Sequence, residues 1–508
     1  MRGPHNLWRL IRTGATFERT GAMRTALEAF DAPPALRVAA RVLGWPFQWL
    51  GLPGDPAQPP ILRALTALGP AYIKFGQLLS TRPDVVGPEL AAQLTVLQDK
   101  LPPFPMAEAR AAIEHEFGQP LDELFADFEP AVAAASLAQV HRAELRATGQ
   151  TVAVKVLRPG IERAFLRDVD AFYFAAGMIE LLAPFARRLR PKAVIRHFEG
   201  VVLGELDLRM EAAAAAEFAA NTERDPGFRV PAVIWPASGR RVLTLEWVSG
   251  INLGDVEALR ASGADLVRLS ERIIQAFLTQ ALRDGFFHAD MHQGNLKLGP
   301  DGALVALDFG IMGRIDAYTR RVYAEILIGF LHRDYARVAE VHFEAGYVPA
   351  EQDRDAFAQA LRSVGEPIFG QDATRISMAR LLGHLFEVTE RFGMETRTEL
   401  ILLQRTMVVV EGVARSLNPQ MNMWETSRPV VTDYIRANLG PAAMARDLAG
   451  MLRVLGRFGP QLPKLAEAAL ARTNAPPPPP PPRRAPGWAY ALAGALVGAG
   501  LVVLGSLL

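Results

Sequence analysis

The chain has 508 residues, more than one hydrophobic core ordinarily contains, so we expect two or three structural units. Its formal net charge is +1 at pH 7, which excludes a globally basic nucleic-acid-binding protein. It contains no cysteine, and this excludes disulfides, thiol catalysis and cysteine-ligated zinc.

The first 105 residues are predicted to form a helical N-terminal extension, because apolar residues recur at helical spacing over much of residues 33–102. The start of this extension is too often interrupted by arginine to be a secretory signal peptide. Apolar residues, among them Leu7 and Trp8, are interleaved with these arginines. That pattern fits an anionic membrane surface and a solvated helix equally well. The arginines are Arg2, Arg9, Arg12, Arg19 and Arg24.

Residues 106–250 are predicted to form the small lobe of a kinase-like fold with a long helical insertion. A helix over residues 106–117 is followed by AAASLAQVHRAEL and TVAVKVLRP, whose alternating patterns flank a turn and predict a β-hairpin. Lys155 lies on the second strand, where a kinase carries the lysine that contacts the α- and β-phosphates of ATP. A solvated edge lysine is the alternative interpretation, but the apolar flanking residues favour the functional one.

The loop that would cover the phosphates carries alanines where a kinase carries glycines. Its residues are Ala133, Ala134, Ala135 and Ser136, which we regard as nucleotide-binding candidates. Each methyl group restricts the backbone and obstructs the approach of phosphate oxygens to N–H groups. We therefore expect an unusual nucleotide geometry.

Two further segments complete the predicted small lobe. Asp207 and Glu211 lie four residues apart in a strongly helix-favouring segment, and we expect Glu211 to pair with Lys155, although ordinary surface charge is the alternative. Glu246 and Val248 end a strand where a kinase crosses between its lobes and contacts adenine through backbone groups. These two residues mark the candidate adenine site.

Residues 251–440 are predicted to form the large lobe around the stretch FFHADMHQGNLKLGPDGALVALDFG. This stretch places Asp290 after a His-x-Asp turn, Asn295 five residues later, and Asp308 at the end of a strand in Asp-Phe-Gly, as in kinases. Asn295 and Asp308 offer hard oxygen ligands to Mg²⁺. Asp290 can accept or orient the proton of a hydroxyl or water as the γ-phosphoryl group leaves.

Zinc binding is an alternative interpretation of the same stretch, because His288, Asp290 and His292 alternate along the chain. Gly294 and Asn295 indicate a loop instead, and no further cluster of histidine or cysteine completes such a site in the sequence. After Asp-Phe-Gly the chain continues as GIMGRIDAYTRRVYAEIL, which is short and helical. It leaves no obvious long activation segment for a peptide, and this argues against a protein substrate.

The C-terminal part is predicted to be a membrane anchor on a spacer. Further helices over residues 441–475 precede a proline-rich linker at 476–487 and an uncharged segment at 488–508. At ~1.5 Å per residue, a helix of this length spans the ~30 Å hydrocarbon core of a bilayer. Arg483 and Arg484 precede it, so the positive-inside tendency predicts a single-pass protein of the inner (cytoplasmic) membrane with its catalytic part in the cytoplasm.

Three glycines of this segment fall on one helix face, at positions 494, 498 and 505. Such a face permits close helix pairing and hence a homodimer. Glycine is also common in membrane helices generally, so the two interpretations have equal weight.

Taken together, these motifs resemble the UbiB family of atypical kinase-like proteins, which is linked to ubiquinone biosynthesis. The resemblance covers about residues 62–419. It implies an α+β, two-lobed protein-kinase-like fold with a helical N-terminal extension and a C-terminal transmembrane helix. The segments that carry it are Lys74-Phe75-Gly76-Gln77, the alanine loop, Val152-Ala153-Val154-Lys155, Glu205-Leu206-Asp207, Glu211, His288-Ala289-Asp290 with Asn295, Asp308-Phe309-Gly310, and Glu411-Gly412 with Pro419.

The resemblance also assigns a role to the Lys-x-Gly-Gln helix. It implies that this helix packs over the active site, with Lys74 and Gln77 near Glu205 and Asp207, and blocks the groove used by peptide substrates. Lys74 would then be regulatory or catalytic, and the other three residues regulatory. In one departure from the family pattern, Gln293 stands where the family often has proline.

We therefore expect an enzyme: an atypical kinase or ATPase that binds ATP and Mg²⁺ and promotes ubiquinone synthesis by acting on or extracting a polyprenylated quinone intermediate. The expected partners are this lipid or quinone intermediate, the membrane, ubiquinone-biosynthesis enzymes and a second copy of the chain, with no nucleic acid. Two alternatives remain. One is a protein kinase that phosphorylates ubiquinone-biosynthesis enzymes, and the other is a non-catalytic nucleotide-binding scaffold.

Overall fold

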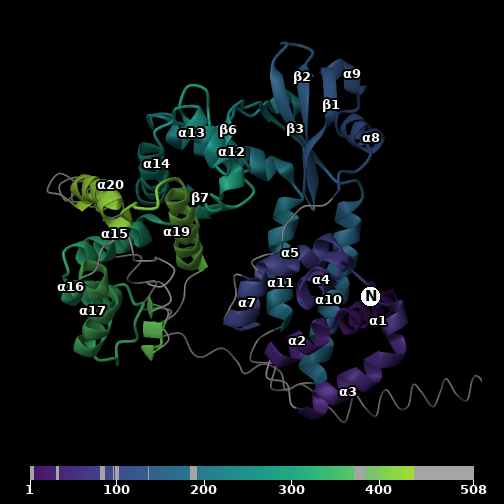
Figure 1. Cartoon of the computed structure of the whole chain (residues 1–508), viewed down its shortest axis with the longest axis horizontal. Helices are drawn as coiled ribbons and strands as arrows, with labels where there is room; N and C mark the ends of the chain where they lie inside the picture. Colours follow the sequence, from purple (N-terminus) through teal and green to yellow (C-terminus); the bar gives the residue numbers. More distant parts are fainter. Residues whose placement is uncertain are drawn as a thin grey trace, which may run out of the picture. The chain divides into compact units, whose positions relative to one another are not determined.

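A computed structural model describes the parts of the chain from which the site is built (Figure 1). The chain divides into two compact units, Met1–Arg436 and Ala437–Leu508. Ser136 and the predicted C-terminal helices, linker and anchor at 441–508 lie outside the described residues. Within the described ranges, no helix combines the length and apolar content needed to cross a membrane. The described residues are 5–29, 34–80, 86–94, 97, 102–135, 137–182, 191–370, 384–385, 387–388, 391–394 and 398–439.

The N-terminal extension is helical, and it shares a core with the helical insertion of the small lobe. Buried side chains of α4, α5 and α7 pack against those of α10 and α11, with Phe75, Phe172 and Phe198 in mutual ring contact. The extension and the insertion, far apart in sequence, therefore form one packed body. Its elements are α1 (His5–Thr20), α2 (Ala22–Ala29), α3 (Pro34–Gly44), η1 (Trp45–Leu50), α4 (Pro60–Leu68), α5 (Pro70–Ser80), α7 (Pro88–Leu94), α10 (Ile161–Leu182) and α11 (Pro191–Glu205).

The small lobe contains a four-stranded antiparallel sheet in the order β1-β2-β3-β5. The strands are β1 (Phe125–Ala134), β2 (Ala138–Leu145), β3 (Thr151–Leu157) and β5 (Val242–Glu246). Helices α8 (Met106–Phe117) and α9 (Leu121–Leu124) precede them, and apolar side chains of these helices share a core with the sheet. The predicted hairpin is confirmed as β2 and β3.

Strand β1 was not predicted, because its sequence FADFEPAVAA contains Pro130 and alternates poorly. Proline has no N–H to donate, so within sheets it is confined to edge strands and bulges. Here β1 is an edge strand, and its pairing with β2 shifts register between Phe128 and Ala131. The sheet therefore accepts the proline at an irregularity of the ladder.

The large lobe begins with helices and encloses two small sheets. Helices α13 (Val256–Ala261) and α14 (Leu266–Thr279) lead through a π-helical turn, η4 (Gln280–Asp284), into β7 (Phe286–His288). One sheet has the order β4-β9-β8-β6, and the other pairs β10 with β7. The other strands of these two sheets, and the short helix η5 that precedes β8, are β4 (Phe228–Arg229), β6 (Ile251–Asn252), η5 (Gln293–Asn295), β8 (Leu296–Leu298), β9 (Leu304–Ala306) and β10 (Met312–Arg314).

The continuation after Asp-Phe-Gly was predicted to be helical, but Met312–Arg314 forms a strand, β10. From Ala317 onward the prediction is confirmed, because the chain continues in helices. They are α15 (Ala317–Leu331), α16 (Tyr335–Glu344), α17 (Arg354–Gly370), α19 (Thr398–Leu417) and α20 (Met423–Leu439). Apolar side chains of α19 join those of α14 and β7 in one core cluster. Helix α19 is thereby fixed beside the strand that carries His288.

Candidate active site

Lys155 of β3 links three distant segments of the chain. Its Nζ atom lies 2.8 and 2.9 Å from the two carboxylate oxygens of Glu211 and 3.2 Å from Oδ2 of Asp308. Glu211 lies in the first turn of α12 (Leu208–Thr222), and Asp308 follows β9. One ammonium group thus joins the small-lobe sheet, a helix and the Asp-Phe-Gly segment.

The electrostatics of this cluster keep Lys155 and Asp308 charged. Burial alone would lower the pKa of Lys155, but the carboxylates of Asp308 and Glu211 outweigh it and raise that pKa. Loss of water around Asp308 opposes its ionisation, yet the Lys155 ammonium lowers the pKa of Asp308 to about 2. Burial raises the pKa of Glu211, and Lys155 opposes that rise. At neutral pH Asp308 is therefore an anion able to bind a cation.

The backbone at Asp308 is held in a conformation unusual for a residue with a side chain. Its φ angle is +56°, in the left-handed region, where aspartate is better tolerated than most residues. Its Oδ1 atom accepts a hydrogen bond of 3.1 Å from the N–H of Gly310. Phe309 is buried, with its ring 5.9 Å from that of Phe218 of α12. These contacts fix the direction in which the carboxylate points.

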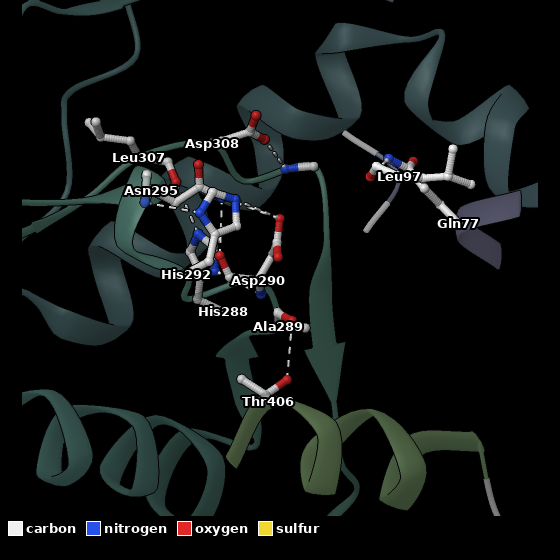
Figure 2. Close-up of polar contacts among 12 residues, drawn as sticks. Gln77, Leu97, His288, Ala289, Asp290, His292, Asn295, Leu307, Asp308 and Thr406 are labelled. Atoms are coloured by element: carbon white, nitrogen blue, oxygen red, sulfur yellow. Dashed lines mark hydrogen bonds and ion pairs between the residues drawn. The ribbon is translucent and has the colours of Figure 1, made fainter. Parts of the chain in front are cut away.

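His288 organises the turn that carries Asp290 (Figure 2). It is fully buried, and its Nδ1 accepts a hydrogen bond of 3.1 Å from the N–H of Asp290. Its Nε2 therefore donates to the carbonyl of Leu307, 3.0 Å away. Burial lowers the pKa of His288, which agrees with a neutral ring. This histidine ties the His-x-Asp turn to the residue before Asp308.

Asn295 is held against Asp290 and Leu307. Its Nδ2 donates to the backbone carbonyl of Asp290 at 3.0 Å and lies 3.3 Å from the Oδ2 atom of Asp290, and the N–H of Leu307 donates to its backbone carbonyl. These bonds leave its amide oxygen available as a ligand. A hard carboxylate oxygen from Asp308 and this amide oxygen fit Mg²⁺ that is also held by nucleotide phosphates.

The zinc alternative does not fit this geometry. Both ring nitrogens of His288 are engaged by backbone groups, and Nδ1 of His292 accepts the N–H of Gly294. His292 Nε2 lies 3.6 Å from Asp290 Oδ2, which is a side-chain contact and leaves the histidine on the loop surface. Across the described ranges, no group of three or more His, Cys, Asp or Glu side chains is arranged to hold a metal ion.

Helix α19 contacts the segment around Asp290 at two places, Ala289 and Gln293, and the sequence did not reveal these contacts. The buried Thr406 hydroxyl lies 3.1 Å from the Ala289 carbonyl and 2.8 Å from that of Leu402 in its own helix, and its single proton is shared between these two acceptors (Figure 2). Gln293 Nε2 donates to Ser416 Oγ at 3.1 Å. The glutamine that stands where proline is frequent in the family thus makes a side-chain bond to a distant helix.

We predict that Thr406→Val lowers ATP turnover about tenfold, because the buried Ala289 carbonyl loses a donor at a cost of about 1–3 kcal/mol beside Asp290. The measurement is kcat and KM for ATP. Thr222→Val is the matched control, since the buried Thr222 hydroxyl donates to Phe218 O within its own helix. Equal kcat in the two variants would show that Thr406 does not position the loop.

The predicted adenine and phosphate-loop residues lie around the sheet of the small lobe. The Glu246 carboxylate contacts Arg229 and lies 3.3 Å from the Ala232 N–H, while the carbonyl of Val248 accepts from Lys297 at 3.2 Å. Ala133 and Ala134 end β1, opposite Val140 and Gln139 of β2.

Ala135 closes the connection to β2, because its N–H donates to the Ala138 carbonyl at 2.8 Å. Its own carbonyl accepts from Arg158 at 3.3 Å. The alanine loop is therefore a tight connection tied to the rest of the small lobe.

The residues assigned to the Lys-x-Gly-Gln helix separate into two groups. Lys74 of α5 forms an ion pair with Glu205, with 2.9 Å between Nζ and Oε2. Gln77 donates to the Leu97 carbonyl at 3.3 Å (Figure 2). Asp207 caps the N-terminus of α12 and pairs with Arg209, which lowers its pKa. The structure thus brings Lys74 to Glu205, while the bonds of Gln77 and Asp207 go elsewhere.

Comparisons with known proteins agree with this architecture. Residues 96–342 match the ABC1 atypical kinase-like domain, and residues 361–422 match the UbiB helical domain. The chain is 40% identical over 412 residues to a Marinobacter nauticus protein called probable protein kinase UbiB, covering 80% of this chain and 75% of that protein. A Serratia proteamaculans protein of the same name is 41% identical over 439 residues, covering 85% of this chain and 80% of that protein. The chain belongs to the UbiB family.

The fold of this UbiB-family protein also resembles a solved structure. The protein Rv3197 of Mycobacterium tuberculosis, determined in complex with erythromycin, matches it with a TM-score of 0.50 and 23% identity, covering 70% of this chain and 90% of that one. The likeness concerns the fold alone. The kinase-like fold with mixed helices and strands is therefore confirmed, and the whole of α19, which contacts Ala289 and Gln293, lies within the UbiB helical domain.

Proposed function

We propose that this UbiB-family protein is a membrane-anchored atypical kinase or ATPase that binds Mg-ATP and supports ubiquinone biosynthesis. In this proposal it acts on, or extracts, polyprenylated quinone intermediates. The observation that carries it is the contact of Lys155 with both Glu211 and Asp308. For phosphoryl transfer, protein kinases require the ion pair of the strand lysine with a helix glutamate and an Asp-Phe-Gly aspartate that holds Mg²⁺.

The roles of the residues follow from their positions. When bound, Mg-ATP supplies the γ-phosphoryl group and the cation that neutralises its charge. Lys155, oriented by Glu211, would bind the α- and β-phosphates, and Asn295 and Asp308 would hold Mg²⁺. Asp290, kept in place by the bonds of Asn295 and His288, would accept or orient the proton of the attacking oxygen.

The nature of the acceptor is part of the proposal. Only β10 and a few connecting residues separate Gly310 from α15, which supports water or a small molecule over a polypeptide. The ion pair between Lys74 and Glu205 would restrain α5 at the site. Segment 488–508 would anchor the chain in the inner membrane with its catalytic part in the cytoplasm, near ubiquinone-biosynthesis enzymes and able to pair as a homodimer.

We expect the purified full chain to hydrolyse ATP, and to do so faster with liposomes that carry a phenolic quinone precursor. Asp290→Asn should lower turnover by about 10²–10⁴-fold, the range typical of a lost general base, because the amide cannot accept the proton. The measurement is phosphate release with and without these liposomes, with nucleotide binding followed in parallel.

Other outcomes would separate the alternatives. Mg-dependent nucleotide binding without hydrolysis above that of Asp290→Asn, under every lipid condition, would indicate a scaffold. Transfer of phosphate from ATP to a ubiquinone-biosynthesis enzyme, lost in the same variant, would indicate a protein kinase.

A further inference from the structure

The N-terminal extension exposes a stripe of large apolar side chains outside the candidate active site. Val38, Val42, Trp45 and Trp49 are 62%, 64%, 71% and 76% exposed, and we call them the aromatic stripe. Covering any of these side chains with a partner would be favourable in free energy, because it would remove a large apolar surface from water. Exposed apolar groups gathered in this way mark an interaction surface.

The stripe is continuous because α3 runs directly into η1. Val38 and Val42 lie one turn apart on α3, and Trp45 and Trp49 lie on η1, the 3₁₀ helix that follows it. Phe47 of η1 is also exposed. None of the six residues of η1 is buried, although three of them are aromatic.

The segment that follows the stripe is packed against α1. Arg19 of α1 donates to the carbonyl of Gly51 at 2.7 Å, and Thr16 Oγ1 accepts the N–H of Leu52 at 3.0 Å. A Cβ atom at Gly51 would overlap the backbone of Ala15, so the segment after η1 lies directly on α1. The two tryptophans therefore lie on a helix whose C-terminal end is fixed against α1.

The charge around the stripe indicates what it binds. Residues 32–54 contain two arginines and no acidic residue, and one acidic side chain of α1, Glu18, lies against Gly44 where α3 meets η1. These arginines, Arg37 and Arg41, immediately precede Val38 and Val42 and are exposed. Tryptophan favours the interface between headgroups and hydrocarbon, and flanking arginine favours anionic lipid. An acidic or purely apolar protein partner would leave one of these two features unused.

We propose that the aromatic stripe inserts into the headgroup region of an anionic phospholipid bilayer. This contact lies far in sequence from the predicted anchor at 488–508 and would hold the N-terminal extension at the membrane surface. Of the N-terminal arginines named above for such a role, Arg9 pairs with Asp168, and Arg19 donates to the carbonyl of Gly51.

The absence of cysteine from the chain allows a direct test. A spin label is attached to the full chain at Trp49→Cys, with Trp45→Cys as a second position should the first not fold. Trp235→Cys is the matched control, because Trp235 is a tryptophan of the small lobe that is 53% exposed. The measurement is the label's collision rate with oxygen relative to a water-soluble nickel chelate, in vesicles of phosphatidylcholine with phosphatidylglycerol.

We expect this ratio to rise several-fold at Trp49→Cys or Trp45→Cys on anionic vesicles, and to stay that of a water-exposed label at Trp235→Cys. An unchanged ratio in the stripe would overturn the proposal. Equal insertion into pure phosphatidylcholine would overturn the assignment to anionic lipid. Immobilisation of the stripe label in detergent without vesicles, growing with protein concentration, would assign the stripe to a protein contact instead. None of these outcomes depends on ATP turnover.

Discussion

Replacing Lys155 with methionine is expected to lower the free energy of unfolding by about 3 kcal/mol, because breaking a buried pair leaves charge without its partner. Glu211 is 8% exposed and Lys155 21%, so water cannot fully compensate the carboxylate. Repulsion between Glu211 and Asp308, which Lys155 now neutralises, adds to the cost. Urea denaturation measures the change.

Two further variants isolate the cause of this loss. Lys192→Met removes an exposed pair with Glu180, of 2.7 Å, and should cost less than about 1 kcal/mol. Lys155→Met combined with Glu211→Leu should recover part of the stability, because apolar residues can replace a buried ion pair. If Lys155→Met lowers the free energy of unfolding no more than Lys192→Met does, water effectively solvates the pair of Lys155 with Glu211.

Gly313→Ala is expected to be the second severe variant, with a loss of about 3 kcal/mol and little remaining ATP turnover. A Cβ atom at position 313 would overlap the ring of Phe287, its partner across β10 and β7. Phe287 is fully buried and meets Phe277 edge to face at 5.7 Å, so its ring has little room to move. Overpacking of this kind typically costs 1–3 kcal/mol, and it would displace the strand that leads into Asp290.

Gly200→Ala is the matched control for this substitution. Gly200 lies within α11, and a Cβ atom there would meet nothing within 4 Å. Alanine favours the helix over glycine by up to about 1 kcal/mol, so this variant should be slightly stabilised. Thermal unfolding and ATP turnover of the two variants are compared. Similar stability for both would show that the core beside β7 relaxes around the added methyl group.

Local sequence patterns sufficed for much of the fold. The hairpin of β2 and β3 alternates clearly, and the alanine-rich α12 has strong helix propensity. The pairing of Lys155 with Glu211 was expected because their motifs occur in kinases at matching places. Strand β1 was not predicted because Pro130 interrupts a sequence that alternates poorly. The sheet tolerates this proline because β1 is an edge strand.

The contacts that hold the site together could not be predicted in this way. The bonds from Thr406 to Ala289 and from Gln293 to Ser416 each join residues that lie more than a hundred positions apart in the sequence. Nothing in the sequence distinguishes Thr406 or Ser416 from the other residues of a helix. The sequence pattern puts Asp207 in the helix-favouring segment with Glu211, but Asp207 stands one residue before α12 and caps it. Helix ends depend on backbone hydrogen bonds that periodicity alone does not locate.

Strand β10 has a consequence for how the candidate active site could be controlled. In many kinases the segment after Asp-Phe-Gly is a free loop that orders or melts, and activity follows its state. Here Met312, Gly313 and Arg314 pair residue by residue with His288, Phe287 and Phe286. Melting this segment would also break the strand pairing beside the His-x-Asp turn, so it would cost more free energy than melting a free loop. The segment after Asp-Phe-Gly and the turn that carries Asp290 are therefore held by the same strand pair.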